Sequence, residues 1–185
     1  MGLERVDRLR REYNVTVRGK AFLLRPDIPE EGVAREPRPE ESGDQLREPL
    51  RTYAQEAGLV MRRPSRTPYT LYALQATEYA REQGQFDAFH HAAYRVYWEH
   101  GKDLGDMAVL QELAEGCGLN WPELKERLDT GYHRATVLDQ YREAINMGIH
   151  GIPAFLVGSL FFTGAQPYEV FQTVMSQALA QQEGQ

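Results

Sequence analysis

The chain has 185 residues, of which 42% are hydrophobic and 26% charged, so intrinsic disorder and fibrous folds are excluded. This length predicts a single domain, or a domain with a sizeable insertion. The net charge of -6 and the sequence pI of about 5.4 argue against a nucleic-acid partner, which draws on a basic surface. The mean hydropathy is -0.57 and no apolar run approaches the ~20 residues of a membrane-spanning helix, which argues against a membrane protein.

Apolar spacing in the first 43 residues predicts a helix, a strand and a loop. Residues 3–12 carry apolar side chains at helical spacing, with charges on the other faces. Residues 15–24 alternate between apolar and polar side chains, which predicts a strand. Residues 25–43 combine Pro26, Pro29, Pro37 and Pro39 with many charges, which predicts an exposed, extended loop.

The next hundred residues read as helices separated by Gly, Asn and Pro. A helix is expected to begin at Thr67, capped by the Thr67 hydroxyl, with Pro68 in its first position. From Gly151 the pattern changes, and residues 154–157 and 160–163 predict a hairpin with Gly158 in a type II′ turn. The remaining helices are expected at residues 48–57, 86–99, 107–116, 121–128, 132–147 and 167–181.

Cysteine content limits the chemistry most strictly. Cys117 is the single cysteine, so these residues cannot form an intramolecular disulfide, a Cys-x-x-Cys pair or a cysteine-rich metal site. His90 and His91 have no second histidine four residues on, and no His-Glu-x-x-His pattern occurs. We therefore predict that the chain binds no metal.

Two short motifs near the C-terminus carry a family resemblance. Gly148-Ile149-His150-Gly151-Ile152-Pro153-Ala154-Phe155, followed by Thr163-Gly164-Ala165-Gln166-Pro167, resembles the C-terminal half of the DsbA-like thioredoxin family, in its FrnE-like branch. The resemblance implies an α/β, thioredoxin-like fold with a large inserted all-helical domain. It places the thioredoxin-like domain at residues 1–43 and 148–185 and the inserted helical domain at residues 44–147.

One departure from the family pattern concerns its N-terminal elements. Members of the family open with a first strand and a Cys-Pro-x-Cys motif at the start of the first helix. Here Gly2 to Val6 match the segment after that motif, so the first strand and both cysteines are expected to be missing. Either the start codon is assigned too late or the chain truly lacks the dithiol.

Loss of that strand would be costly, because the resemblance places it at the centre of the sheet. Burying some five apolar side chains there contributes roughly 1.5–3 kcal/mol each. The sum, on the order of 10 kcal/mol, rivals the whole stability of a typical domain. The backbone groups left unpaired on the two neighbouring strands could also pair with a strand of another chain. We expect the chain to fold marginally, to swap a strand or to form a homodimer across the gap.

The resemblance marks Gly151, Ile152 and Pro153 as the substrate-binding segment. Without it, Pro153 would simply be a trans proline opening a strand. With it, a cis Ile152–Pro153 bond is expected to turn the Ile152 backbone toward an extended substrate. His150 is a possible modulator that could stabilise a thiolate, and otherwise an exposed loop histidine. No catalytic cysteine is present.

The other singled-out residues have simpler interpretations. Cys117 stands between two glycines at a predicted helix end, where a thiolate is not favoured. It is interpreted as a small buried apolar residue, with a redox-sensing thiol or an intermolecular disulfide as the alternative. His90 is interpreted as a packing residue.

Three functions remain open on sequence alone. The first is a thiol-disulfide oxidoreductase that exchanges dithiols with protein or small-molecule disulfides when its Cys-x-x-Cys is present, this chain alone being redox-inactive. The second is a non-catalytic substrate-binding or chaperone-like module. The third is a glutathione-dependent isomerase or transferase of the hydroxychromene-carboxylate isomerase type. Apart from glutathione in that third case no cofactor is expected, and the single cysteine favours a bacterial cytoplasmic location.

Overall fold

The computed structural model describes residues 1–36, 38, 41 and 43–183, and these residues form two compact units. Unit 1 comprises residues 1–20 and 144–185, and unit 2 comprises residues 21–143. The second boundary falls inside a helix. No helix among the described residues is long and apolar enough to cross a membrane.

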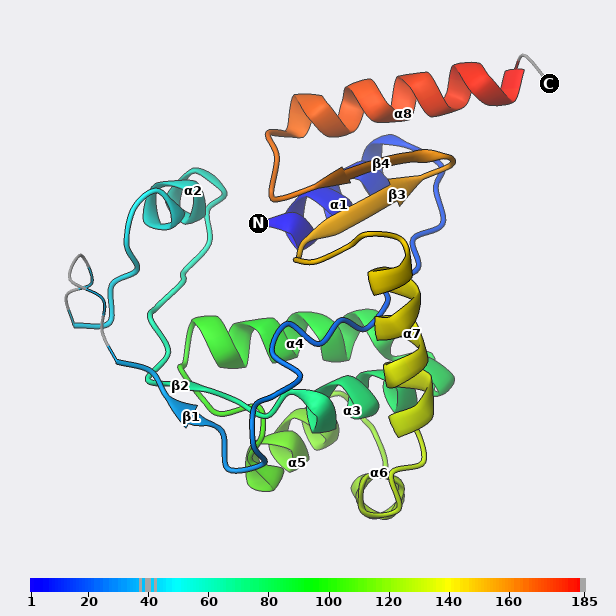
Figure 1. Ribbon diagram of the computed structural model, residues 1–185. Coiled ribbons are helices and arrows are strands. Elements are labelled where there is room, and N and C mark those ends of the chain that lie inside the picture. Colours follow the sequence, from blue (N-terminus) through cyan, green and yellow to red (C-terminus); the bar gives the residue numbers. More distant parts are fainter. Residues whose placement is uncertain (37, 39–40, 42, 184–185) are drawn as a thin grey trace. The chain divides into compact units, whose positions relative to one another are not determined.

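Unit 1 is built on a β-hairpin. Strand β3 (Ala154–Val157) pairs antiparallel with β4 (Leu160–Thr163), with Ala154 opposite Thr163 and Val157 opposite Leu160. Gly158 has a φ of 60° whereas the φ of Ser159 is not positive, which confirms the predicted type II′ turn. Helices α1 (Gly2–Glu12) and α8 (Tyr168–Glu183) complete the unit (Figure 1).

One face of the hairpin packs against these helices. Leu9 of α1 and Phe171 of α8 are buried together with Met175, and Phe155 and Phe162 of the hairpin pack against them. The Phe155 and Phe162 rings stack 5.0 Å apart, and each meets Phe171 edge to face. The ends of the two helices are also joined, because the Tyr168 hydroxyl donates to a Glu12 carboxylate oxygen at 2.8 Å.

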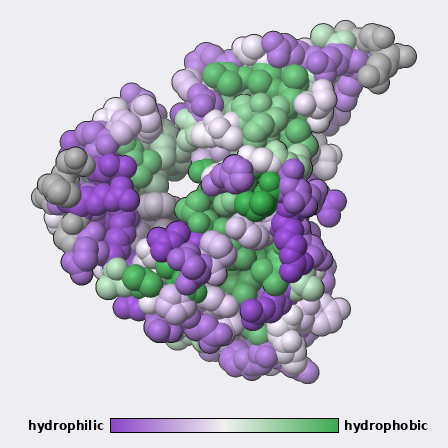
Figure 2. All heavy atoms as spheres, in the orientation of Figure 1, coloured by the Kyte–Doolittle hydropathy of each residue, from purple (hydrophilic) through white to green (hydrophobic). Residues whose placement is uncertain are grey.

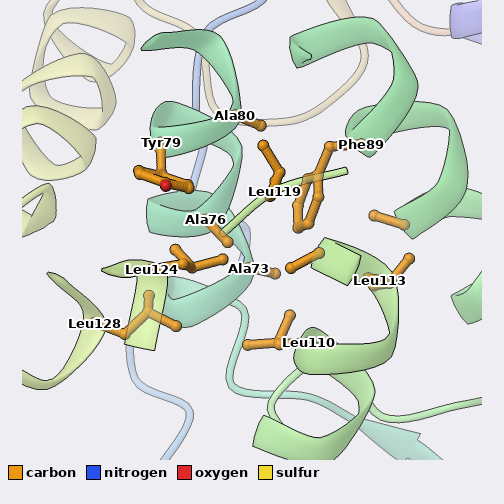
Figure 3. Close-up of a cluster of buried hydrophobic side chains, with 12 residues drawn as sticks. Ala73, Ala76, Tyr79, Ala80, Phe89, Leu110, Leu113, Leu119, Leu124 and Leu128 are labelled. Carbon is orange, nitrogen blue, oxygen red and sulfur yellow. The ribbon is translucent and has the colours of Figure 1, made fainter. Parts of the chain in front are cut away.

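Unit 2 is mainly helical. Its elements are β1 (Val33–Ala34), α2 (Leu50–Glu56), β2 (Arg66–Thr67), α3 (Leu71–Glu82), α4 (Phe86–Trp98), α5 (Met107–Gly116), α6 (Trp121–Asp129) and most of α7 (Arg134–Asn146). The main core lies between α3, α4, α5 and α6, where Tyr79, Phe89, Leu110 and Leu124 are fully buried (Figure 3). The side chains from these helices point toward one another.

The structure corrects two sequence predictions of local structure, the strand at residues 15–24 and the helix start at Thr67. Residues 15–24 form no strand, because no neighbouring strand pairs with them among the described residues. The Val15 amide instead bonds to the Tyr13 carbonyl, and the Val17 carbonyl accepts from Arg10. Further along, the Ala21 amide donates to Gln140, and Ala21 and Leu23 pack against Leu71 and Val137. The first segment of unit 1 accordingly ends at Lys20. The division at residues 43 and 147 that the resemblance implies stays a prediction.

The helix expected to begin at Thr67 begins instead at Leu71, after Thr70, which makes no side-chain cap. Thr67 instead belongs to β2, which pairs antiparallel with β1, and it lies opposite Val33. The loop predicted over residues 25–43 consists of turns and irregular chain on both sides of β1, and Pro37 and Pro39 lie outside the described residues. Figure 2 shows hydrophilic colour dominating this charge-rich part of unit 2.

Candidate functional site

The segment between α7 and β3 forms a hollow of about 390 Å³ in unit 1. Gly148, with a φ of 77°, ends α7, and the chain then runs through His150 to the hairpin. The lining combines this loop with the far end of β4: Gly148, His150, Gly151, Ile152, Pro153, Thr163 and Gly164. All four residues selected from the sequence therefore meet at one hollow.

Pro153 anchors this loop on the rest of unit 1. The Ile152–Pro153 peptide bond is cis, and the Pro153 carbonyl accepts a hydrogen bond from the Gly164 amide at 2.8 Å. The start of α1 lies against the proline ring, because a Cβ on Gly2 would be 3.1 Å from both Cβ and Cγ of Pro153. The first turn of α1 is thus held beside the hollow.

Ile152 has backbone groups that are free to bond to a ligand. Its amide and carbonyl form no hydrogen bond with any other described residue, and its side chain is 48% exposed. An amide and a carbonyl open to solvent at the end of a strand are suited to pairing with an extended peptide. The site thus offers main-chain recognition, and its lining residues include no cysteine.

His150 and the end of β4 complete the lining. His150 is exposed at the rim, where its imidazole can approach a bound molecule. The sequence analysis did not select Thr163 and Gly164 as site residues. They reach the hollow because the hairpin register sets Thr163 opposite Ala154 and Gly164 next to Pro153. The predicted two-residue turn at Gly158 already implies this register, because it pairs Val157 with Leu160 and therefore Ala154 with Thr163.

Cys117 lies elsewhere, in unit 2, at a shallow hollow of about 550 Å³ between α4 and α5. His91, Arg95 and Glu112 line the same hollow. The Cys117 thiol is partly buried, and burial raises its pKa, with the nearby Arg95 acting in the opposite direction. A raised pKa keeps the sulfur protonated at neutral pH and therefore weakly nucleophilic. His90 stacks on Phe86 and meets Tyr94, consistent with a packing residue.

The described residues contain no cluster of three or more metal-ligating side chains. A charge network is nevertheless present between α3 and α6. Arg127 pairs with Glu82 and Glu123 and lies over the ring of Tyr79, whose hydroxyl donates to Glu123 at 2.9 Å. These groups satisfy one another, so we assign the network to stability.

Comparison with known proteins agrees with this fold. The family model described as a DSBA-like thioredoxin domain matches residues 1–176, and the chain therefore belongs to that family. The resemblance drawn from the sequence is confirmed, as is the thioredoxin-like α/β fold with its helical insertion.

Individual relatives extend the comparison. The uncharacterized protein YwbO of Bacillus subtilis (strain 168) is 26% identical over 113 residues, which cover 59% of this chain and 55% of YwbO. A probable DsbA oxidoreductase from Streptomyces coelicolor is 30% identical, with a TM-score of 0.65, over 70% of this chain and 57% of its own. The chain thus spans little more than half the length of these relatives.

A structure titled 2-hydroxychromene-2-carboxylate isomerase aligns with a TM-score of 0.73 over 98% of this chain and 90% of its own. Its sequence identity is 14%, so this likeness concerns the fold alone.

Proposed function

We propose that residues 1–185 are the substrate-binding part of a thiol-disulfide oxidoreductase of the DsbA-like family. The observation that supports this most strongly is the unpaired backbone of Ile152 beside Pro153, at a hollow lined by the motif for which the family resemblance implies substrate binding. An extended segment of a disulfide-containing protein adds there as a short strand, and its main chain bonds to the Ile152 amide and carbonyl.

Dithiol exchange needs two thiols, one to attack the substrate disulfide and one to resolve the mixed disulfide. Cys117 is the single cysteine of the sequence, and it lies in unit 2 with a pKa raised by burial. We therefore propose that these residues bind a substrate without exchanging its disulfide. Activity requires a cysteine pair supplied to the start of α1, beside Pro153.

A peptide with one fluorescent end and an extended, apolar sequence tests the binding. We expect saturable binding by anisotropy, and loss of binding when N-methyl groups remove the amide donors on the peptide edge that faces Ile152. The matched control carries N-methyl groups on the opposite edge and should bind normally, because alternate residues of a strand donate to opposite sides. Equal binding of the two methylated peptides would refute main-chain recognition.

A disulfide-exchange assay tests the chemistry. The chain should not accelerate the reduction of a protein disulfide by dithiothreitol, and Cys117→Ser should behave identically. Acceleration that Cys117→Ser abolishes would overturn the proposal.

A non-catalytic binding module is the second candidate, favoured by the same single cysteine. Fusion of a strand and a Cys-Pro-x-Cys segment before Met1 separates the two candidates. Gain of exchange activity supports the oxidoreductase, and peptide binding without such a gain supports the module. For the glutathione-dependent alternative, binding of glutathione in a titration, without peptide binding, would be the supporting result.

A further inference from the structure

We infer that the start of α7 is an acid-sensitive latch, in which protonation of His133 releases the turn at residues 130–133 and the first turn of α7 from α3. The inference goes beyond the proposed function and does not depend on it. It rests on the polar composition of the contact between α3 and α7, on a buried amide without a partner, and on the charges around His133.

The α3–α7 seam is the contact between one stripe of α3 and residues 133–137. The stripe is a set of side chains at spacings of three and four residues, which share one face of the helix: Leu71, Gln75, Glu78 and Glu82. At one end of the seam, Leu71 and Val137 belong to the same buried apolar cluster. At the other end, the His133 Nδ1 is 3.8 Å from a Glu82 carboxylate oxygen. One apolar cluster therefore closes a seam whose other members are polar.

Gln75 lies on the stripe between these two ends and disfavours the closed seam. Its side chain is 2% exposed, and its Oε1 has no hydrogen-bond partner in the described part of the chain. A buried amide oxygen without a partner has lost its hydrogen bonds to water and made none in exchange. Opening of the seam returns this oxygen to water, so Gln75 favours the open state at every pH.

His133 stands where a positive charge is disfavoured. Its carbonyl accepts the Val137 amide at 3.1 Å, so it occupies the cap position of α7, and the N-terminal end of a helix carries partial positive charge. Its Nε2 is 3.5 Å from a guanidinium nitrogen of Arg127 in α6, which is itself paired with Glu123. The ring of Tyr132 meets the imidazole edge to face. An imidazolium would therefore lie beside the helix end and the guanidinium together.

Two carboxylates of α3 act in the opposite direction. Glu82 lies beside the His133 Nδ1, but it is also paired with Arg127. Glu78 is likewise paired, with Arg81. Burial lowers the pKa of His133 most strongly, against Glu82 and Glu78, which raise it, and Arg127 lowers it further. The closed latch therefore holds a neutral imidazole.

Acid shifts this latch toward its open state. In the open state the imidazole is in water with a pKa of about 6.5, so it binds a proton at a pH where the closed state does not. Each such proton favours the open state. Between pH 7 and pH 5 the open population should rise by up to about 25-fold, the limit for an imidazole that stays neutral in the closed latch.

Amide hydrogen exchange of the full chain measures the opening. The Val137 amide bonds to the carbonyl of the cap residue His133, and the Leu110 amide of α5 bonds in the same way to the cap residue Asp106. After correction for the intrinsic exchange rate, the protection of Val137 should fall by up to about 25-fold from pH 7 to pH 5. An unchanged protection of Val137 would overturn the inference.

The same two amides separate local opening from global unfolding. At pH 5 the protection of Val137 should be well below that of Leu110 and insensitive to low urea concentrations, because a local opening exposes little surface. Protection of Leu110 should fall with urea. Equal protection of the two amides, with the same dependence on urea, would mean that only global unfolding exposes Val137 and would exclude the latch.

His133→Gln tests which group titrates. Glutamine keeps a polar side chain without a titrating group, so the protection of Val137 should no longer depend on pH. His100→Gln is the control at an exposed histidine and should keep the pH dependence. The same pH dependence in His133→Gln as in the wild-type protein would contradict the assignment to His133.

Gln75→Met tests the seam itself. Methionine is about as long as glutamine but has no amide, so the closed seam no longer buries an oxygen without a partner. The protection of Val137 should rise at both pH 7 and pH 5. Gln177→Met, at an exposed position of α8, should leave it unchanged. Lower protection of Val137 in Gln75→Met would overturn this account of the seam.

Discussion

At the scale of single residues, His133 shows how burial sets a protonation state. It is 4% exposed, with its Nδ1 3.8 Å from a Glu82 carboxylate oxygen and its Nε2 3.5 Å from the Arg127 guanidinium. Burial lowers its pKa and outweighs Glu82, which acts to raise it, while Arg127 lowers it further. The folded protein therefore prefers the neutral imidazole.

This preference predicts a pH dependence of stability. In the unfolded chain the pKa of a histidine is about 6.5. Above that pH, His133 is neutral in both the folded and the unfolded state, so its burial does not make the free energy of unfolding depend on pH. As the pH falls below that value the unfolded chain binds a proton more readily than the folded one, so stability is lost. His133→Gln should flatten the fall in urea midpoint between pH 7 and about pH 5, whereas His100→Gln, at an exposed position, should not. An unchanged slope in His133→Gln would contradict the assignment.

At the scale of elements, polar contacts join α1 and α8 at the edge of an apolar core, where Glu12 accepts hydrogen bonds from Tyr168 and Gln172. Tyr168 is 5% exposed, its hydroxyl donates to Glu12, and the Arg8 guanidinium lies 3.8 Å from the centre of its ring. Burial and the hydrogen bond to Glu12 raise the pKa of Tyr168 to about 12. The phenol therefore remains a donor throughout the ordinary pH range.

Tyr168→Phe should lower the free energy of unfolding by about 1 kcal/mol, since it removes a hydrogen bond to a partly exposed carboxylate. Chemical denaturation measures the loss. The wild-type protein should also lose stability as the pH rises above 10, because the unfolded phenol ionises before the folded one. Tyr132→Phe is the matched control at a ring that is 64% exposed, and it should be nearly neutral. An equal loss of unfolding free energy in Tyr132→Phe would contradict the assignment of the stabilisation to the hydrogen bond between Tyr168 and Glu12.

The elements also show what the sequence can predict. Helix α4 was predicted almost to the residue, because its aromatic stripe repeats at helical spacing and needs no distant partner. The alternation of residues 15–24 was misleading, since a strand exists only where a neighbour accepts its hydrogen bonds. Motif order predicted that His150 and Pro153 share a site, whereas Thr163 joins them only through the hairpin register. The Arg127–Glu82 pair joins residues 45 positions apart, and no local pattern marks it.

At the scale of the whole molecule, the two units differ in the size of their buried hydrophobic clusters. Unit 2 buries an apolar cluster between four helices that follow one another in the chain, from Ala73 to Leu128. Unit 1 combines the two ends of the chain around one hairpin and a smaller buried cluster. A domain with its own core can fold alone, and contacts between neighbours in the chain favour rapid folding.

We therefore expect a fragment of residues 21–147, which retains all of α7, to fold without unit 1. Its far-ultraviolet circular dichroism should be strongly helical and its thermal unfolding cooperative. Leu110→Ala removes a fully buried side chain from the core of unit 2 and should destabilise both fragment and full chain by roughly 2–5 kcal/mol. Leu179→Ala, in unit 1, should leave this unfolding step unchanged in the full chain. A fragment that is unfolded, or that melts without cooperativity, would show that the helical unit depends on the hairpin unit for its stability.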